Sequence, residues 1–116
     1  MKKILLVDDE DGIQMLYREE LQDSGYEVIS AYTGEEGLEK VKSEAPDLVI
    51  LDIQMPGMNG IETLRQMKMD NPDLPVILSS AYNEYKQDLG AWASDAYIVK
   101  SSNIDDLKAA VAKFLV

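Results

Sequence analysis

Leu48-Val49-Ile50-Leu51-Asp52 is the stretch that decides the fold class, because four consecutive apolar residues run directly into a carboxylate. A continuous apolar run of this length is typical of a strand that is covered on both faces, as in a parallel sheet. Comparable runs stand at residues 4–7 and 75–78, with a weaker one at 27–31 and a last one at 96–99. The sequence therefore predicts five short strands.

Apolar residues at helical spacing fill the intervals between these runs. The clearest set is Ile13, Leu16, Tyr17 and Leu21, which predicts a helix with one buried face that ends at Ser24-Gly25. The other expected helices cover residues 35–44, a segment from Ile61 to Met67, a more polar segment 82–92, and a last segment that Asn103 caps and that carries Leu107, Val111 and Phe114. Strand and helix thus alternate five times. We expect an α/β fold, a doubly wound (βα)5 domain over residues 1–116 with a five-stranded parallel sheet.

The composition excludes several classes of protein. With 22 acidic and 11 basic residues the formal net charge is −11, so the surface repels nucleic-acid phosphates and anionic lipids. The chain has no cysteine and no histidine, which excludes disulfides, zinc–thiolate sites and imidazole catalysis. Any metal must then be held by oxygen ligands. Because no apolar run is long enough for a membrane span or a signal peptide, we expect a cytoplasmic location.

Polar side chains stand at the carboxyl ends of the expected strands, which is where ligands bind in open α/β sheets. In chain order they are the acidic run Asp8-Asp9-Glu10-Asp11, then Asp52, Ser79, Ser80 and Lys100. A hydroxyl and an ammonium group are suitable partners for phosphoryl oxygens. Side chains alternate along a strand, and this alternation alone leaves open whether Ser79 or Ser80 points toward the other groups.

Asp8, Asp9 and Asp52 are expected to crowd together, and carboxylates at close range repel one another unless a cation lies between them. A hard divalent ion such as Mg²⁺ suits one or two direct carboxylates that water and a phosphoryl oxygen complete. Taken alone, the acidic run after the first strand would be interpreted as a solvated loop and helix start, where acidic residues favour the helix dipole. Together with Asp52 at the end of a buried strand, it indicates a functional site. A carboxylate in that position can act as a nucleophile and form an acyl phosphate.

Four segments of the chain match one protein family in order. They are residues 4–10 (ILLVDDE), 46–60 (PDLVILDIQMPGMNG), 75–82 (PVILSSAY) and 97–100 (YIVK). Over essentially its whole length the chain resembles the CheY-like receiver domain of bacterial two-component response regulators. The resemblance implies the flavodoxin-like strand order 2-1-3-4-5.

The resemblance also implies a role for each matched residue. The phosphoryl acceptor would be Asp52. The Mg²⁺ ligands would be Asp8, Asp9, Asp52 and the backbone carbonyl of Gln54. The phosphoryl-binding and switch residues would be Ser80, the backbone N–H of Ala81, Lys100 and Tyr97, an aromatic residue that changes rotamer on activation. Gln54 and Tyr82 stand where the family tunes dephosphorylation, and the bulk of Tyr82 predicts slow to moderate self-dephosphorylation.

Two positions depart from the family pattern. Lys100 is followed by Ser101 rather than by the usual proline. A cis peptide bond before a residue other than proline costs about 2.5–4 kcal/mol, so the Lys100–Ser101 bond is either trans with a shifted loop or cis and strained. Trp92-Ala93-Ser94 stands where the family often has glycine, which makes Trp92 either a partner contact or a core residue.

We expect a phosphorylation-activated signalling switch of a two-component phosphorelay that acts by protein–protein contact. The implied partners are a sensor histidine kinase or phosphotransfer protein as donor and a downstream effector protein or domain as reader. The protein is expected to be no enzyme beyond its own phosphoryl transfer and self-dephosphorylation. The alternative is a degenerate receiver that binds partners without phosphorylation. Acids after the first strand argue against a flavin protein, and Gln54 argues against a dehalogenase-type phosphatase, which needs a second aspartate there.

The sequence leaves the kinase, the stimulus, the output target and the phosphoryl lifetime open. It also leaves open whether the domain stands alone or belongs to a longer regulator. The oligomeric state is open too. Receivers often pair through the face formed here by the segments 82–92 and 96–99 and the last helix, so a homodimer through that face is the form the resemblance suggests.

Overall fold

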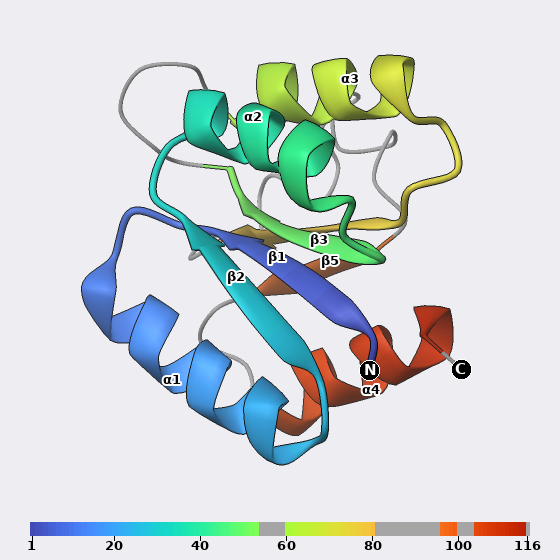
Figure 1. Ribbon diagram of the computed structural model, residues 1–116. Helices are drawn as coiled ribbons and strands as arrows, with labels where there is room; N and C mark the ends of the chain where they lie inside the picture. The colour runs from blue at the N-terminus through green and yellow to red at the C-terminus, as the bar shows by residue number, and fades with distance from the viewer. Residues whose placement is uncertain (54–59, 81–95, 100–103, 116) are drawn as a thin grey trace.

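Five strands and four helices make up the described part of the computed structural model, which covers residues 1–53, 60–80, 96–99 and 104–115 (Figure 1). In chain order they are β1 (Lys3–Val7), α1 (Asp11–Asp23), β2 (Glu27–Ala31), α2 (Gly34–Glu44), β3 (Leu48–Asp52), α3 (Gly60–Asp70), β4 (Val76–Ser80), β5 (Ala96–Val99) and α4 (Ile104–Phe114). The strands pair in parallel in the order β2-β1-β3-β4-β5, which confirms the expected topology. The helix expected at residues 82–92 and the expected cap Asn103 lie outside the described residues.

The four described helices cover the sheet in pairs, one pair on each face, and strand side chains alternate between the two apolar layers. Ile4 and Leu6 of β1 pack in the cluster that includes residues of α1 and α4. Leu5 and Val7 pack in the cluster that includes residues of α2 and α3. Figure 1 shows these helix pairs on opposite sides of the sheet. Burial on both faces explains the unbroken apolar runs of β1 and β3, which the edge strand β2 lacks.

The buried face of α1 differs from the expected one. Gln14, Tyr17 and Leu21 are the buried residues of this helix, whereas Leu16 is 48% exposed. The expectation that Leu16 shares the buried face was therefore wrong. Leu16 comes one residue before Tyr17, about 100° around the helix and toward solvent. The end of the helix is as predicted, because Gly25 has a φ of 95° just beyond Ser24.

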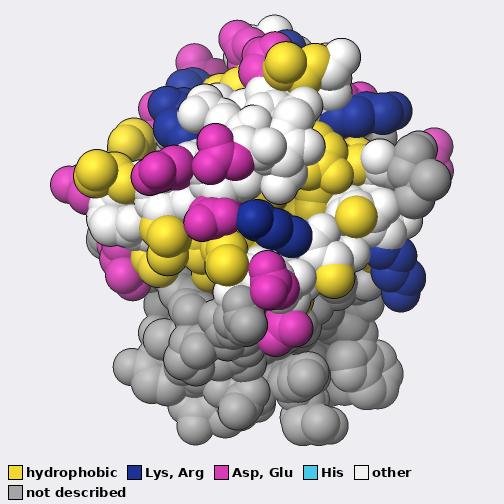
Figure 2. Space-filling model, turned by 90° about the horizontal axis from the view of Figure 1, so that it is seen from below, with side chains coloured by type: hydrophobic (Ala, Val, Ile, Leu, Met, Phe, Trp, Pro, Cys, Tyr) yellow, Lys and Arg dark blue, Asp and Glu magenta, His cyan; other side chains and the backbone are white. Residues whose placement is uncertain are grey.

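The face covered by α1 and α4 carries mixed side chains, with acidic and basic groups beside one another and apolar groups between them (Figure 2). One ion pair joins the two helices, since Nζ of Lys108 lies 2.7 Å from Oε2 of Glu20. Met15 and Leu16 are the exposed large apolar residues of α1. None of the described helices has the length and apolarity that a bilayer crossing requires.

Strand β2 forms one edge of the sheet, and cations of two helices cover its outer carbonyls. Residues Glu27 and Ala31 bond toward β1, through Glu27 N to Lys2 O at 2.9 Å and Asp8 N to Ala31 O at 3.0 Å. By the alternation of a parallel strand, the carbonyls of residues 28 and 30 point outward. Arg18 of α1 donates to Val28 O at 3.1 Å, and Lys40 of α2 donates to Ser30 O at 2.9 Å.

Candidate functional site

Four carboxylates meet at the carboxyl ends of β1 and β3. They belong to Asp8, Asp9, Glu10 and Asp52, and one oxygen from each lies within 4.8 Å of the others. Asp8 and Asp52 are 1% and 2% exposed, whereas Asp9 and Glu10 are exposed. The structure thus brings together the three aspartates that the topology predicted. Glu10 is an addition, which the sequence showed only as a member of the acidic run.

The loop after β1 is held in a tight turn by its own polar groups. Asp8 N donates to Ala31 O at 3.0 Å, which continues the pairing of β1 with β2 by one residue. Glu10 N donates to Oδ1 of Asp8 at 2.9 Å, a local side-chain turn of the kind that aspartate favours. Gln14 N then donates to Glu10 O at 3.0 Å and starts the hydrogen-bond pattern of α1. These bonds fix the backbone of the loop whose carboxylates lie close to that of Asp52.

Asp52 is placed by the pairing of β3 with β4. It lies opposite Ser79 in the register of the two strands, and Ile53 N donates to Ser79 O at 3.1 Å. The side chain of Ser79 is 1% exposed. Ser79 is therefore the serine that the structure describes next to Asp52, while the side chain of Ser80 lies outside what it describes.

The start of α3 packs directly on the end of β3. Gly60 N donates to Ile53 O at 2.9 Å. A Cβ atom at Gly60 would lie 2.5 Å from Asp52 O and 2.7 Å from Ile53 O, closer than real Cβ atoms come. Glycine is thus required where the helix approaches the backbone of Asp52.

The donor set at this edge fits a hard divalent cation. Unit charges 4–5 Å apart repel by about 3–4 kcal/mol at an effective dielectric constant of 20. Four acidic groups whose oxygens lie within 4.8 Å of one another are therefore costly to hold together without a counter-charge. Carboxylate oxygens are the ligands that Mg²⁺ and Ca²⁺ prefer, and the exposed side of the cluster leaves room for water or a substrate oxygen.

The remaining residues of the predicted site fall into two groups. Ser80 and Tyr97 lie in β4 and β5 at the expected positions, and their side chains lie outside the described part. The other predicted positions, together with Trp92 and the Lys100–Ser101 bond, lie outside the described residues altogether: Gln54, Ala81, Tyr82 and Lys100. The roles of all these residues stay predictions.

Sequence reasoning missed Gln14, which is 3% exposed and bonds to backbone carbonyls beside the acidic loop. A signal was available, because Gln14 stands three and seven residues before Tyr17 and Leu21, and these spacings place all three on one helix face. A search for apolar residues alone overlooks a buried amide in such a pattern.

Comparisons with known proteins agree with this geometry. The family model of the response regulator receiver domain matches residues 4–112. Sporulation initiation phosphotransferase F of Bacillus subtilis (strain 168) is 40% identical over 98% of this chain and 94% of its own length. PhoP, the alkaline phosphatase synthesis transcriptional regulatory protein of the same organism, is 38% identical over 98% of this chain, which spans only 48% of that protein.

Solved structures of the response regulator TrrA from Thermotoga maritima are also similar. One, in complex with Mg²⁺-BeF, has a TM-score of 0.95 and 50% identity and covers 98% of this chain and 99% of that one. Another, in complex with the histidine kinase ThkA, has a TM-score of 0.93 and 49% identity over the full length of both chains.

Proposed function

The chain belongs to the family of response regulator receiver domains, and on that premise we propose that it is a phosphorylation-activated switch with Asp52 as phosphoryl acceptor. The observation that carries the proposal is the convergence of four carboxylates around the buried end of β3. Asp52 combines a nucleophilic oxygen with a fixed position and little exposure to bulk water.

Mg²⁺ is the cofactor that we propose for this site. Asp8, Asp9 and Asp52 would hold it together with the backbone carbonyl of Gln54. Support comes from the oxygen-only donor set and from TrrA, whose structure contains Mg²⁺-BeF. When bound, the ion supplies positive charge that offsets the carboxylates and the charge on a transferring phosphoryl group.

The donor that we propose is a phosphohistidine of a sensor histidine kinase or of a phosphotransfer protein. A carboxylate oxygen of Asp52 forms a bond to phosphorus while the P–N bond breaks, and the imidazole nitrogen keeps the electron pair. The complex of TrrA with ThkA supports a kinase partner.

The signal is read through a change of shape near the acceptor. We propose that Ser80, the N–H of Ala81 and Lys100 bind the phosphoryl oxygens, and that Tyr97 changes rotamer as they do so. A local change of charge then shifts the population between two forms of the domain. The reader would be an effector protein or domain, as the regulators among the relatives suggest. Gln54 and Tyr82 would set the rate of self-dephosphorylation.

The geometry of the acidic site gives little support to the alternative of a degenerate receiver. A receiver that has lost phosphorylation has no need of a nucleophile and metal ligands in register, yet this chain keeps Asp8, Asp9 and Asp52 together. We further propose that the domain works in the cytoplasm, where histidine kinases present their phosphoryl groups, and that any homodimer forms through the segment 82–92, β5 and α4.

Intact mass spectrometry after incubation with acetyl phosphate and Mg²⁺ tests the proposal. We expect a single added phosphoryl group in the wild type and in Asp70→Asn, which changes an exposed aspartate at the end of α3. We expect none in Asp52→Ala or in the presence of EDTA.

The controls make the outcomes specific. An adduct that persists in Asp52→Ala would move the acceptor elsewhere. If acetyl phosphate gives no adduct although Mg²⁺ binds, a histidine kinase donor is the next reagent. Failure with both donors would overturn the switch and favour the degenerate receiver.

A further inference from the structure

Gln14 is the one buried polar side chain of α1 in the described residues, and its amide reaches across to the strands. Nε2 lies 3.2 Å from Leu6 O, 2.9 Å from Asp8 O and 3.0 Å from Ala31 O. A primary amide has two N–H groups, so three acceptors share them. This set of carbonyls also fixes which end of the amide is nitrogen, because an oxygen there would face only other acceptors.

The three carbonyls mark the point where the acidic loop leaves the sheet. Leu6 and Ala31 belong to β1 and β2 near their carboxyl ends, and Asp8 is the first residue after β1. Ala31 O accepts from Asp8 N as well as from Gln14, so the two bonds meet on one atom. The amide of Gln14 therefore holds Asp8 against the ends of both strands.

The backbone of Gln14 holds the other end of the same loop. Gln14 N donates to Glu10 O at 3.0 Å, while the side chain binds Asp8 O. Three of the four converging carboxylates, those of Asp8, Asp9 and Glu10, lie on the segment between these two attachments. One residue thus fixes both ends of the segment that faces Asp52.

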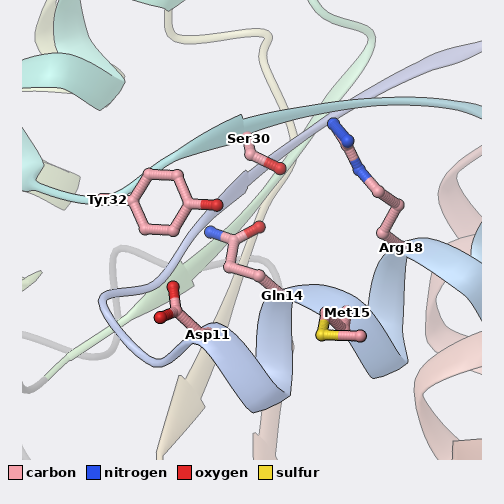
Figure 3. A pocket seen from close by; sticks show the side chains of 6 residues that line it. All are labelled: Asp11, Gln14, Met15, Arg18, Ser30 and Tyr32. Atoms are coloured by element: carbon pink, nitrogen blue, oxygen red, sulfur yellow. The ribbon is translucent and has the colours of Figure 1, made fainter.

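Gln14 also lines an open groove of about 330 Å³ between α1 and the end of β2. Figure 3 shows its amide pointing from α1 toward the β2 side, with Asp11 and Arg18 on the same helix and Ser30 and Tyr32 beyond it. Substitutions that keep the volume of a buried side chain are tolerated best, so a residue of similar size can replace Gln14 without overpacking.

We propose that Gln14 is a positioning residue of the acidic site, which sets the spacing of Asp8, Asp9 and Glu10 relative to Asp52. This inference rests on the proposed function, because the property that Gln14 controls is the affinity for Mg²⁺. Groups that orient metal ligands from behind typically change metal affinity 10- to 100-fold when they are lost. A residue that only supports the fold would change stability and leave the affinity of the folded protein unaltered.

Gln14→Met tests the inference, because methionine keeps the size and removes the amide. We expect the dissociation constant for Mg²⁺, measured by calorimetry, to rise about tenfold. We also expect the amide protons of Asp8 and Glu10 to exchange faster with solvent in the metal-free protein. Saturating Mg²⁺ should restore most of the rate of phosphorylation by acetyl phosphate.

Leu21→Val is the matched control, since Leu21 lies on the same buried helix face and touches none of the acidic residues in the described contacts. It should lower the stability and leave both the Mg²⁺ affinity and the exchange of Asp8 and Glu10 unchanged. Gln14→Asn, whose shorter side chain cannot reach the same carbonyls, is the second variant if Gln14→Met does not fold.

Each outcome is decisive for one of the two proposals. Wild-type affinity for Mg²⁺ in both Gln14 variants would assign Gln14 a purely structural role and overturn this inference alone. An equal loss of affinity in Leu21→Val would overturn it too, because any loosening of α1 would then suffice. Absence of Mg²⁺ binding in the wild type would instead overturn the proposed metal site, and with it the need for a positioning residue.

Discussion

The two ends of the sheet treat acidic residues in opposite ways. At the carboxyl end four carboxylates point toward one another within 4.8 Å, and two of them are buried. At the amino end a lysine lies among the acids: Nζ of Lys3 is 4.0 Å from Glu27 Oε2 and 3.7 Å from Glu44 Oε1, and Lys3 N donates to Asp47 Oδ2 at 2.8 Å. Among the described residues, the acids at the amino end lie around a lysine, whereas those at the carboxyl end lie around one another and form a donor set that suits a cation. Charges arranged against stability in this way are typical of functional sites.

Gly60→Ala should have the largest effect on stability, because the new side chain would clash with the backbone at the carboxyl end of the sheet. The added Cβ would lie 2.5 Å from Asp52 O, so α3 or β3 must move. We expect the free energy of unfolding in urea to fall by about 3 kcal/mol.

Gly12→Ala is the control for this prediction, since a Cβ there meets no atom within 4 Å. Alanine in the first turn of α1 should leave stability unchanged or raise it by about 0.5–1 kcal/mol. Equal losses in the two variants would show that close approach at Gly60 is not what matters.

Asp8→Asn should separate stability from function at the acidic end. The amide oxygen can still accept from Glu10 N, and one negative charge leaves the cluster. Without metal we expect the free energy of unfolding to rise by about 1–2 kcal/mol, while Mg²⁺ affinity falls at least tenfold. Urea titrations with and without Mg²⁺ measure both, and a variant less stable than wild type without metal would contradict the repulsion argument.

Lys3→Met should show how little the balanced end contributes. Its ion pairs are partly exposed, with side-chain exposures of 28% for Lys3 and 51% and 45% for its partners. Pairs of this kind contribute about 0–1 kcal/mol, so we expect a loss within that range that shrinks in high salt. A loss of stability that is large and insensitive to salt would show that the charged groups at the amino end stabilise the fold more than partly exposed ion pairs usually do.

Lys108→Met should have the smallest effect on stability, because Lys108 belongs to neither of the two groups of acidic residues compared above. The hydrogen bond to Glu20 raises the pKa of Lys108 above its ordinary value of 10.5, so the folded state binds the proton more tightly. The stability from this pair is fully present below pH 10.5 and is lost as the pH rises through the pKa of the folded state. Melting temperatures from pH 8 to 12 should fall less steeply at the alkaline end in the variant, and parallel curves would disprove the linkage.

Much of the architecture could be predicted from hydrophobic pattern, because burial on both faces forces most of β1, β3 and β4 (residues 4–7, 48–51 and 76–78) to be apolar. The convergence of Asp8, Asp9 and Asp52 followed from topology, since parallel strands end at one edge. The direction in which individual side chains point was harder to predict from the sequence. Leu16 and Gln14 lie two residues apart, and apolarity favoured the wrong one, because the amide of Gln14 is buried by hydrogen bonds to carbonyls that only the folded sheet brings together. Ser79 and Ser80 are chemically identical, so the sequence could not indicate which of them lies opposite Asp52. That depends on the pairing register of β3 with β4, which places Ser79 there.

The covered edge of β2 has a consequence for self-association. An uncovered edge strand is a template on which a second chain can add a strand, and repetition of that step leads to fibrils. Here the outward carbonyls of Val28 and Ser30 are already bonded to Arg18 and Lys40, which come from opposite faces of the sheet. An incoming strand must displace both cations before its own N–H groups can bond to these two carbonyls. The two side chains therefore act as gatekeepers of this edge, because a strand that pairs along it in full must displace both of them.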